Sequence, residues 1–331
     1  MSAEPREPRW SAGSWKLCIK IFVSVGLLAY LLRRVEFADV GRLLTRADPL
    51  LLAGAVVLYL AGQALSALKW RRLATAVGFR ASGARFVAYY FIGMFFNAFG
   101  FGTVGGDVVR ALYLAGGKGR RGLALNTVIA DRVSGLAMLL VVAIVALLVF
   151  HHYELPTAIY WTVIALGTIV VGSWRLLPRL LPRLLPRENR LRRVVERDLA
   201  PYWFDTRLLA DVAMFSVVFH LSQIAVLIIL THALGLAIPW SYCFVFGPLV
   251  NIMAAIPISM NGLGVREGGY VFFLAHIGLS RDSAVAFALT WFAVVMLCGA
   301  VGGLVYVAHR QARPRDEEEQ MGREVKSSIV R

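Results

Sequence analysis

Long apolar segments recur along almost the whole chain, and their length limits what the chain can fold into. An α-helix needs roughly 20 apolar residues to cross the hydrocarbon core of a bilayer, and most of the segments approach that length. Of the 331 residues, 58% are hydrophobic, more than a soluble core of this size can enclose. The sequence therefore predicts an all-α polytopic membrane protein. Hydropathy places the segments at 17–32, 50–68, 86–104, 123–150, 158–174, 208–231, 240–260, 268–279 and 283–308.

The chain is strongly basic, with a formal net charge of +15. Its Lys and Arg residues stand between the apolar segments, which argues against a nucleic-acid partner and fits attraction to anionic lipid head groups. Cys18, Cys243 and Cys298 each lie in or beside an apolar segment, without zinc or disulfide spacing. We therefore expect no metal and no cofactor. Because no cleavage site follows the first apolar segment, we interpret that segment as an uncleaved span.

The distribution of Lys and Arg between the segments predicts the topology, because basic loops stay on the cytoplasmic side. Residues 69–85 carry five of them, residues 105–122 carry four and the linker 175–207 carries nine, whereas 151–157 and 232–239 carry none. If every segment crossed the bilayer, the basic linker would lie outside whenever the N-terminus lies inside.

This conflict disappears if residues 86–122 and 240–279 each enter and leave the membrane by the same face. The sequence then predicts about six full transmembrane helices and two re-entrant helical hairpins of opposite orientation, with both termini in the cytoplasm. Only the four arginines of residues 33–49 remain on the wrong side. The chain then divides into a cytoplasmic tail at 1–16, a transmembrane domain at 17–309 that includes the basic linker, and a second cytoplasmic tail at 310–331.

The basic linker contains "RLLPRLLPRLLPR", in which proline recurs at every fourth position. Each proline removes a helix hydrogen bond, so no regular α-helix is expected there. Two roles stay open for this stretch: an interfacial segment that holds acidic lipids, or a solvated linker that fixes the topology. Residues 35–47 are amphipathic and are expected either to lie in the membrane interface or to form a polar loop.

The two expected hairpins share a pattern: an apolar helix, a glycine-rich break, an acid and an arginine, then a short aromatic-rich helix. "FNAFGFGTVGGDVVRALYLA" stands in the first half and "AAIPISMNGLGVREGGYVFFLA" in the second, which predicts an inverted repeat. Irregular backbone at membrane depth is stable only where it packs in protein or lines a wet cavity, so the breaks are the expected site. Their glycines are Gly102, Gly105, Gly106, Gly262 and Gly264.

Charged residues follow both breaks, although a charge near the middle of a bilayer costs at least about 2.5 to 3.5 kcal/mol. Asp107 and Arg110 are three residues apart at the start of a short helix, so they can share a face. Arg266 and Glu267 hold the matching position in the second half. These residues are expected either to bind a ligand or to form salt bridges that clamp each hairpin.

A further acid–arginine pair, Asp131 and Arg132 in "NTVIADRVSGLAMLL", lies one to two turns inside the fourth segment. It either snorkels at the cytoplasmic interface without a ligand role or turns inward. In the second case Arg132 joins Arg110 and Arg266 in binding phosphate oxygens bidentately. "SALKWRRLATAVG" is interpreted as an interfacial anchor around Trp70 in preference to a direct site.

No GxSxG, HExxH or Walker A motif occurs in the sequence, and no carboxylate cluster has metal-binding density. We therefore do not expect an enzyme, and without an ATPase motif any transport is downhill or driven by an ion gradient. His220 and Gln223, one turn apart, are expected to tie helices together by hydrogen bonds.

Four motifs occur in a characteristic order: "LKWRRLATAVG", "GTVGGDVVRALYL", "ADRVSGL" and "NGLGVREGG". In this order they resemble the flippase-like family of the transmembrane region of lysylphosphatidylglycerol synthases, over residues 15–309. The resemblance implies a multi-pass protein of the bacterial or archaeal inner membrane that moves an aminoacylated or otherwise modified phospholipid between leaflets. Some relatives are associated with hopanoid or polyprenyl-linked lipids. For the lipid head group, the resemblance implies Asp107, Arg110, Asp131, Arg132, Asn261, Arg266 and Glu267.

The full synthases of this family carry a soluble aminoacyl-transferase domain after the membrane region. Only 22 residues follow His309 here, so aminoacyl-lipid synthesis by this chain is not expected.

Three functions stay open on the sequence. The main hypothesis is a lipid flippase or transporter whose arginines hold phosphate while the hairpins rock to expose the site to each leaflet. The alternatives are a membrane-embedded transferase with Glu267 or Asp107 as general base, and a non-catalytic partner of a lipid-modifying enzyme. The expected partners are a membrane phospholipid or related polar lipid and, in the third case, that enzyme; the sequence fixes no oligomeric state.

Overall fold

Every regular element that the structure describes is a helix, which confirms the all-α prediction. Five of these helices are long and apolar enough to cross a membrane. The first expected span falls almost wholly outside the described residues. The computed structural model describes residues 35–100, 103–186, 188–256 and 262–311, together with Phe22, Gly26, Ala29 and Ser259.

Short helical elements separate the five long helices along the chain. The five long helices are α3 (Pro49–Ala76), α6 (Arg121–Val149), α7 (Thr157–Leu184), α10 (Thr206–Ala233) and α13 (Arg281–Gln311). Two pairs of shorter helices stand where the hairpins are expected: α4 (Gly83–Phe99) with α5 (Thr103–Ala115), and α11 (Trp240–Ala255) with α12 (Val265–His276). The other short elements are α2 (Phe37–Arg46), η1 (Lys118–Arg120), η2 (His151–Tyr153), α8 (Arg190–Arg193), η3 (Val194–Asp198) and α9 (Ala200–Phe204).

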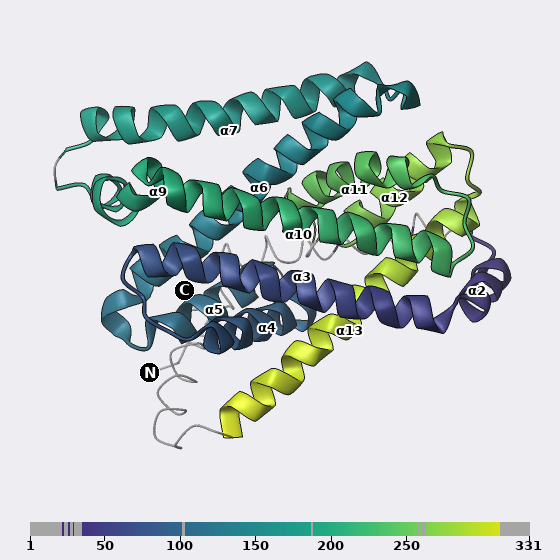
Figure 1. Ribbon diagram of the computed structural model, residues 1–331, viewed down its shortest axis with the longest axis horizontal. Coiled ribbons are helices and arrows are strands. Elements are labelled where there is room, and N and C mark those ends of the chain that lie inside the picture. Colours follow the sequence, from purple (N-terminus) through teal and green to yellow (C-terminus); the bar gives the residue numbers. More distant parts are fainter. Residues whose placement is uncertain are drawn as a thin grey trace, which may run out of the picture.

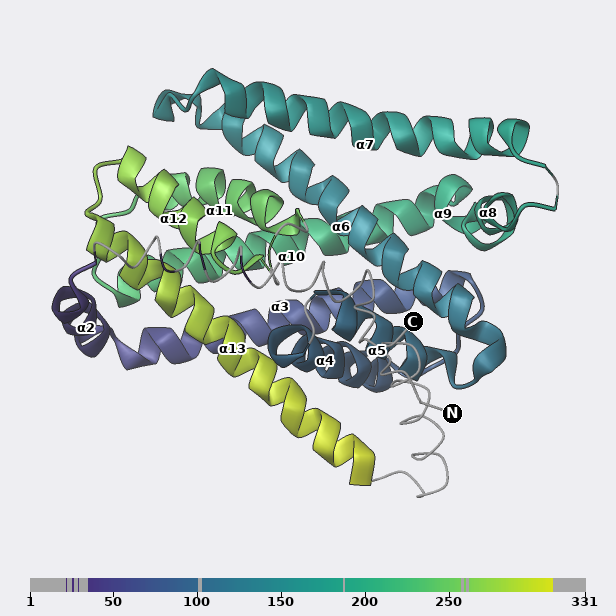
Figure 2. The same ribbon diagram turned by 180° about the vertical axis from the view of Figure 1, so that it is seen from behind.

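The two pairs of shorter helices have the dimensions of re-entrant hairpins. The longest of the four helices has 17 residues, so it reaches only about 26 Å, less than the roughly 30 Å of a hydrocarbon core. The two members of each pair pack on each other. Figures 1 and 2 place the two hairpins toward opposite ends of the long axis of the molecule.

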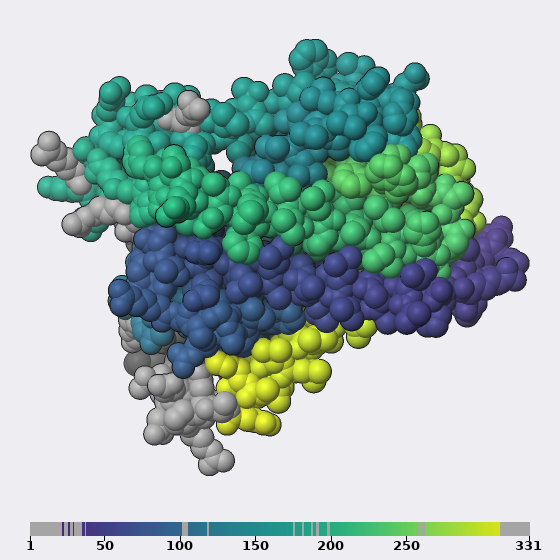
Figure 3. Space-filling view, viewed as in Figure 1, coloured from purple at the N-terminus to yellow at the C-terminus, as the bar shows by residue number. Residues whose placement is uncertain are grey.

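The contacts between helices follow a two-fold pattern. Helices α3 and α10 lie side by side and run antiparallel. At one end, the Asp48 N–H donates to the Ala233 carbonyl at 2.9 Å. At the other end, the hydroxyl of Tyr202, just before α10, donates to the Leu73 carbonyl at 2.9 Å. Figure 3 shows the two helices as neighbouring bands across one face. Helix α4 packs on α13 and α5 on α6; correspondingly, α11 packs on α6 and α12 on α13. This arrangement agrees with the expected inverted repeat.

The proline repeat does not prevent a helix, which corrects the prediction for this stretch. Helix α7 continues to Leu184 and contains Pro178 and Pro182. Residues four apart lie on nearly the same face of a helix, so the missing hydrogen bonds are confined to one side and the remaining residues sustain the helix. Pro186 lies beyond its end. The amphipathic segment near residue 40 is also a helix, α2, and not a polar loop.

The described residues form four apolar clusters, and the two largest hold the centre of the bundle together. The larger one lies where α10, α11, α12 and α13 meet, and its aromatic residues Phe246, Tyr270, Phe287 and Trp291 pack edge to face. The second joins α3, α4, α5 and α6, where the Trp70 and Phe86 rings lie 4.9 Å apart. Its Trp70 ring also contacts Arg110, one of the charged residues described next.

Candidate functional site

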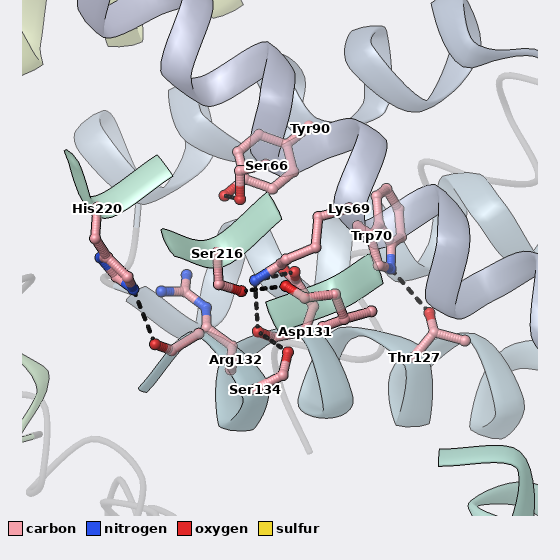
Figure 4. Close-up of polar contacts among 12 residues, drawn as sticks. Ser66, Lys69, Trp70, Tyr90, Thr127, Asp131, Arg132, Ser134, Ser216 and His220 are labelled. Atoms are coloured by element: carbon pink, nitrogen blue, oxygen red, sulfur yellow. Dashed lines mark hydrogen bonds and ion pairs between the residues drawn. The ribbon is translucent and has the colours of Figure 1, made fainter. Parts of the chain in front are cut away.

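A network of charged side chains lies buried where α3, α5 and α6 meet, and Figure 4 shows part of it around Asp131. The Lys69 Nζ of α3 lies 3.0 Å from Asp131 Oδ1 and donates to the Asp131 carbonyl at 3.1 Å. The Arg110 Nη1 of α5 donates to Asp131 Oδ2 at 3.0 Å. These three side chains are at most 4% exposed. Asp131 therefore faces two buried cations and does not snorkel to the interface.

Asp107 extends this network to the surface of the protein. Its carboxylate accepts hydrogen bonds from Arg132 Nε and Nη2, both at 3.0 Å, and lies 3.3 Å from Arg110 Nε. Asp107 and Arg110 therefore share a face of α5 and form an ion pair. Arg132 is 52% exposed and Asp107 18% exposed. Although Asp131 and Arg132 are adjacent in the chain, one faces the protein interior and the other faces outward.

The charges of the network do not balance. Lys69, Arg110 and Arg132 are cations, whereas only Asp107 and Asp131 are anions, so the five side chains carry a net charge of +1. Buried charges are stable only when they are paired, and the exposed guanidinium lies at the outer end of the network. A cluster of this kind can bind an anion, because a guanidinium donates to carboxylate or phosphate oxygens in pairs.

Aromatic rings fix the position of Arg110. Its Cζ lies 4.9 Å from the ring centres of both Trp70 and Tyr90, a cation–π geometry on two sides. The rings are held in turn, since Trp70 Nε1 donates to Thr127 Oγ1 at 2.9 Å and the Tyr90 hydroxyl lies 2.9 Å from Ser66 Oγ. The guanidinium is therefore preorganised between α3, α4 and α6.

Lys69 and Trp70 belong to this site, which corrects the interpretation of "SALKWRRLATAVG" as an interfacial anchor. Trp70 is fully buried and Lys69 is 4% exposed, whereas the next two residues, Arg71 and Arg72, are exposed. Successive residues on a helix point about 100° apart, so one basic cluster is divided between the interior and the surface.

A polar stripe on α3 leads from the network toward the second hairpin. Tyr59, Gln63, Ser66 and Lys69 follow one another at intervals of three or four residues, so they share one face of the helix. Each is at most 9% exposed. This spacing is visible in the sequence and could have identified Lys69 as a residue that faces inward.

Helix α10 packs against α3 and carries the buried polar residues His220 and Gln223. The His220 Nε2 lies 3.0 Å from the Gly135 carbonyl oxygen of α6, so the predicted role in tying helices together is confirmed for His220. The Gln223 Nε2 is buried without a hydrogen-bond partner among the described residues. A Cβ at Gly62 would lie 2.8 Å from this nitrogen, which shows how closely α3 and α10 approach.

Close packing of α4 against α5 brings Arg110 to the network. A Cβ at Gly106 would overlap the Gly93 carbonyl oxygen, and the Gly106 N–H donates to Asn97 Oδ1 at 2.9 Å. At Gly105 the nearest atom to a Cβ is 3.8 Å away. Both glycines lie in the first turn of α5, not in the break as expected, because the helix already begins at residue 103.

The second hairpin contains a true glycine break. Gly262 and Gly264 have φ angles of +74° and +82°, which side chains with a Cβ rarely adopt. Glu267 is 5% exposed and accepts the Gly264 N–H at 2.6 Å, so it caps α12. Arg266 makes no ion pair within the described part of the chain, and its Nε is buried without a hydrogen-bond partner there. Adjacent helix residues diverge, which keeps Arg266 and Glu267 from pairing.

The three arginines expected to form one site are therefore divided. Arg110 and Arg132 share a carboxylate in the first half, whereas Arg266 belongs to the second hairpin. Arg266 stands one helical turn before Tyr270 in α12, and Tyr270 and Tyr59 both pack on the ring of Trp291. Because Tyr59 is one end of the polar stripe and Lys69 the other, α3 connects the two arginine environments.

The exposed end of the network lies among apolar side chains of α6. Ile129, three residues before Arg132, is 49% exposed, and Val133, the residue after it, is 42% exposed. Arg132 stands eleven residues after the first residue of α6, about 16 Å along the helix. A cation beside an exposed apolar surface, this far from the end of a membrane helix, suits an amphiphile better than a soluble anion.

Two expected site residues, Gly102 and Asn261, lie outside the described residues. Where the structure does describe the chain, no group of three or more His, Cys, Asp or Glu side chains could hold a metal ion.

Comparison with known proteins agrees with the motifs and with the helical architecture. A search of curated proteins gave no match. A family model described as "Lysylphosphatidylglycerol synthase TM region" matches residues 17–303, which include both hairpins and every residue of the charged network. The chain is a multi-pass membrane protein and belongs to the family of the lysylphosphatidylglycerol synthase TM region.

Proposed function

We propose that this protein moves a membrane lipid with a phosphate-containing head group from one leaflet to the other. The observation that supports this function best is the net positive network, which is buried at one end and reaches an apolar surface through Arg132 at the other. A phospholipid has the matching composition, an anionic phosphate joined to apolar chains. The family supports a role connected with membrane lipids.

In this function Arg132 makes the first contact with the lipid. Its guanidinium is held by Asp107, so an incoming phosphate competes with a carboxylate for the same pair of N–H donors. Asp107 keeps its contact with Arg110 when Arg132 turns to the lipid. The acyl chains remain beside Ile129 and Val133 and do not enter the protein.

The two hairpins provide the alternating access that such movement requires. They approach from opposite ends of the bundle, and each rests on a long helix of the other half. Rocking of one hairpin against the other would expose the head group first to one side and then to the other. The polar stripe of α3, from Lys69 to Tyr59, lines the route, and Arg266 is the cation of the second hairpin, one turn from Tyr270.

The transferase alternative has less support, because both candidate bases are engaged. Glu267 accepts the N–H of Gly264 as a helix cap, and both carboxylate oxygens of Asp107 accept from Arg132. Each carboxylate therefore already has a structural role, Glu267 as a helix cap and Asp107 as a counter-charge.

Reconstitution in vesicles tests the proposed function. Fluorescent phosphatidylglycerol in the inner leaflet becomes accessible to a membrane-impermeant quencher only after it is moved, so the quenched fraction measures translocation. Arg132→Gln is expected to slow it at least tenfold. Arg72→Gln is the matched control, because Arg72 is similarly exposed (59%) and pairs with Asp211 at 3.8 Å outside the network. Equal rates for Arg132→Gln and wild type, or equal slowing in both variants, would reject the function proposed for the network.

A further inference from the structure

A hollow of about 450 Å³ lies at the end of α3, apart from the buried network. It is formed by the last turns of α3, the loop that follows and the first turn of α4. No residue of the charged network contributes to it. Its lining consists of Arg71, Thr75, Phe79, Arg80, Ala81, Ser82 and Arg85.

The hollow contains positive charge without a compensating carboxylate. Arg71, Arg80 and Arg85 are exposed, no acidic residue lines the hollow, and none of the three arginines forms an ion pair within the described part of the chain. Arg72, which is also exposed, does not line the hollow and faces Asp211. Cytoplasmic loops of membrane proteins are generally basic, which explains positive charge in this region. That tendency does not explain why three arginines surround one hollow.

The loop that carries these arginines is held in a fixed conformation. Gly78 adopts a φ of +85°, and the Phe79 N–H donates to the Ala74 carbonyl at 3.0 Å. Phe79 is 3% exposed, and Arg120 lies 4.0 Å over its ring while donating to the Gly78 carbonyl at 3.0 Å. A fixed loop lowers the entropy that ligand binding must offset.

The beginning of α4 completes the polar surroundings. Ser82 caps the helix by accepting the Arg85 N–H at 3.3 Å, and its hydroxyl lines the hollow together with that of Thr75. A Cβ at Gly83 would lie 3.5 Å from Arg71 Nη1, so this guanidinium lies over the first turn of α4. Hydroxyl and guanidinium donors therefore surround the same space.

We infer that this hollow is a second anion site, which binds a phosphate group through Arg71, Arg80 and Arg85. The three guanidiniums match the oxygens of a phosphate in charge and in hydrogen-bonding geometry. The phosphate belongs to an anionic lipid of the adjacent leaflet or to a soluble phosphate, and the two sources share this chemistry. The site is independent of the proposed translocation, because it shares no residue with the charged network.

Native mass spectrometry of the full chain in detergent tests the inference. Phosphatidylglycerol is titrated as the probe, with inorganic phosphate added as a competitor, and the bound lipids are counted on wild type, on Arg80→Gln/Arg85→Gln and on Arg72→Gln/Arg207→Gln. The second double variant removes the same charge from arginines that do not line the hollow. The first is expected to lose one bound phosphatidylglycerol, with at least fivefold weaker binding, while the control keeps it.

The competition identifies the source of the phosphate. Retention of the lipid on wild type at high inorganic phosphate assigns the site to a lipid head group. Displacement of the lipid, together with thermal stabilisation of wild type but not of Arg80→Gln/Arg85→Gln by inorganic phosphate alone, assigns it to a soluble phosphate. Equal loss of lipid in the two double variants, or no loss in either, would overturn the site.

Discussion

Lys69 and Asp131 form an ion pair of 3.0 Å between α3 and α6, and each side chain is only 4% exposed. The two residues are 62 positions apart in the chain and lie well inside their helices. A pair of this kind is not a surface clamp, because both charges are almost completely removed from water. The remaining charges of the network extend from this pair toward the exposed Arg132.

Loss of the central carboxylate should destabilise the protein strongly. Asp131→Asn leaves Lys69 buried without an anion and leaves Arg110 with Asp107 alone, and an uncompensated buried charge costs about 3–5 kcal/mol. Thermal unfolding of the purified protein in one detergent measures the loss. Asp211→Asn is the control, because it removes the exposed partner of Arg72 and should change stability by less than about 1 kcal/mol. Similar losses in both variants would show that Asp131 is not an essential counter-charge.

Removal of the outer carboxylate should increase the affinity for anionic lipid. Asp107→Asn raises the net charge of the network from +1 to +2 and frees the Arg132 donors that now bind the carboxylate. An exposed ion pair is worth about 1 kcal/mol, which corresponds to roughly fivefold tighter binding. Titration of the purified protein with phosphatidylglycerol measures this change, and phosphatidylcholine serves as the zwitterionic comparison. An unchanged or weaker affinity would argue against competition between Asp107 and phosphate.

The contact between α4 and α5 predicts different outcomes for two neighbouring glycines. Gly106→Ala should destabilise the protein by about 1–3 kcal/mol, since its Cβ would overlap the Gly93 carbonyl oxygen in a packed interface. Gly105→Ala should be neutral or slightly stabilising, because its Cβ would lie at an ordinary van der Waals distance of 3.8 Å from the nearest atom and alanine favours a helix. Thermal unfolding compares the two variants directly. A greater loss for Gly105→Ala would contradict this packing of the hairpin.

Substitution of Glu267 separates its capping role from a charge role. Glu267→Gln keeps an oxygen that can accept the Gly264 N–H and should retain wild-type stability, whereas Glu267→Ala should lose about 1 kcal/mol. Both variants are compared by thermal unfolding and in the vesicle assay. If Glu267→Gln were as unstable as Glu267→Ala, the negative charge, and not the cap, would be what the hairpin requires.

The hairpins could be predicted because they depend on properties that are local in sequence. Short apolar segments, glycine breaks and the positions of arginines each restrict how a segment can cross a bilayer, and α5 and α12 are indeed short. The proline repeat departs from its prediction for a local reason as well. Pro178 and Pro182 lie on one side of α7, so they do not act as separate interruptions and leave the rest of the helix intact.

The members of the charged network could be predicted only in part. Asp107, Arg110, Asp131 and Arg132 stand out because charges are rare inside apolar segments. Lys69 was missed because it is the first residue of a basic cluster whose other members are exposed. Only its spacing from the polar residues of α3, which places it on their face of the helix, distinguishes Lys69 from the exposed arginines.

The sequence by itself determined that this chain is a membrane protein with long helices and two short hairpins, because the bilayer selects for apolar length and loop charge. Only the tertiary structure decided which charges meet. Lys69 joins Asp131, Arg132 binds Asp107, and Arg266 remains apart because each pairing depends on the rotation and depth of helices that are distant in sequence. Those quantities are fixed by how the side chains of neighbouring helices pack, which no single segment of the sequence contains.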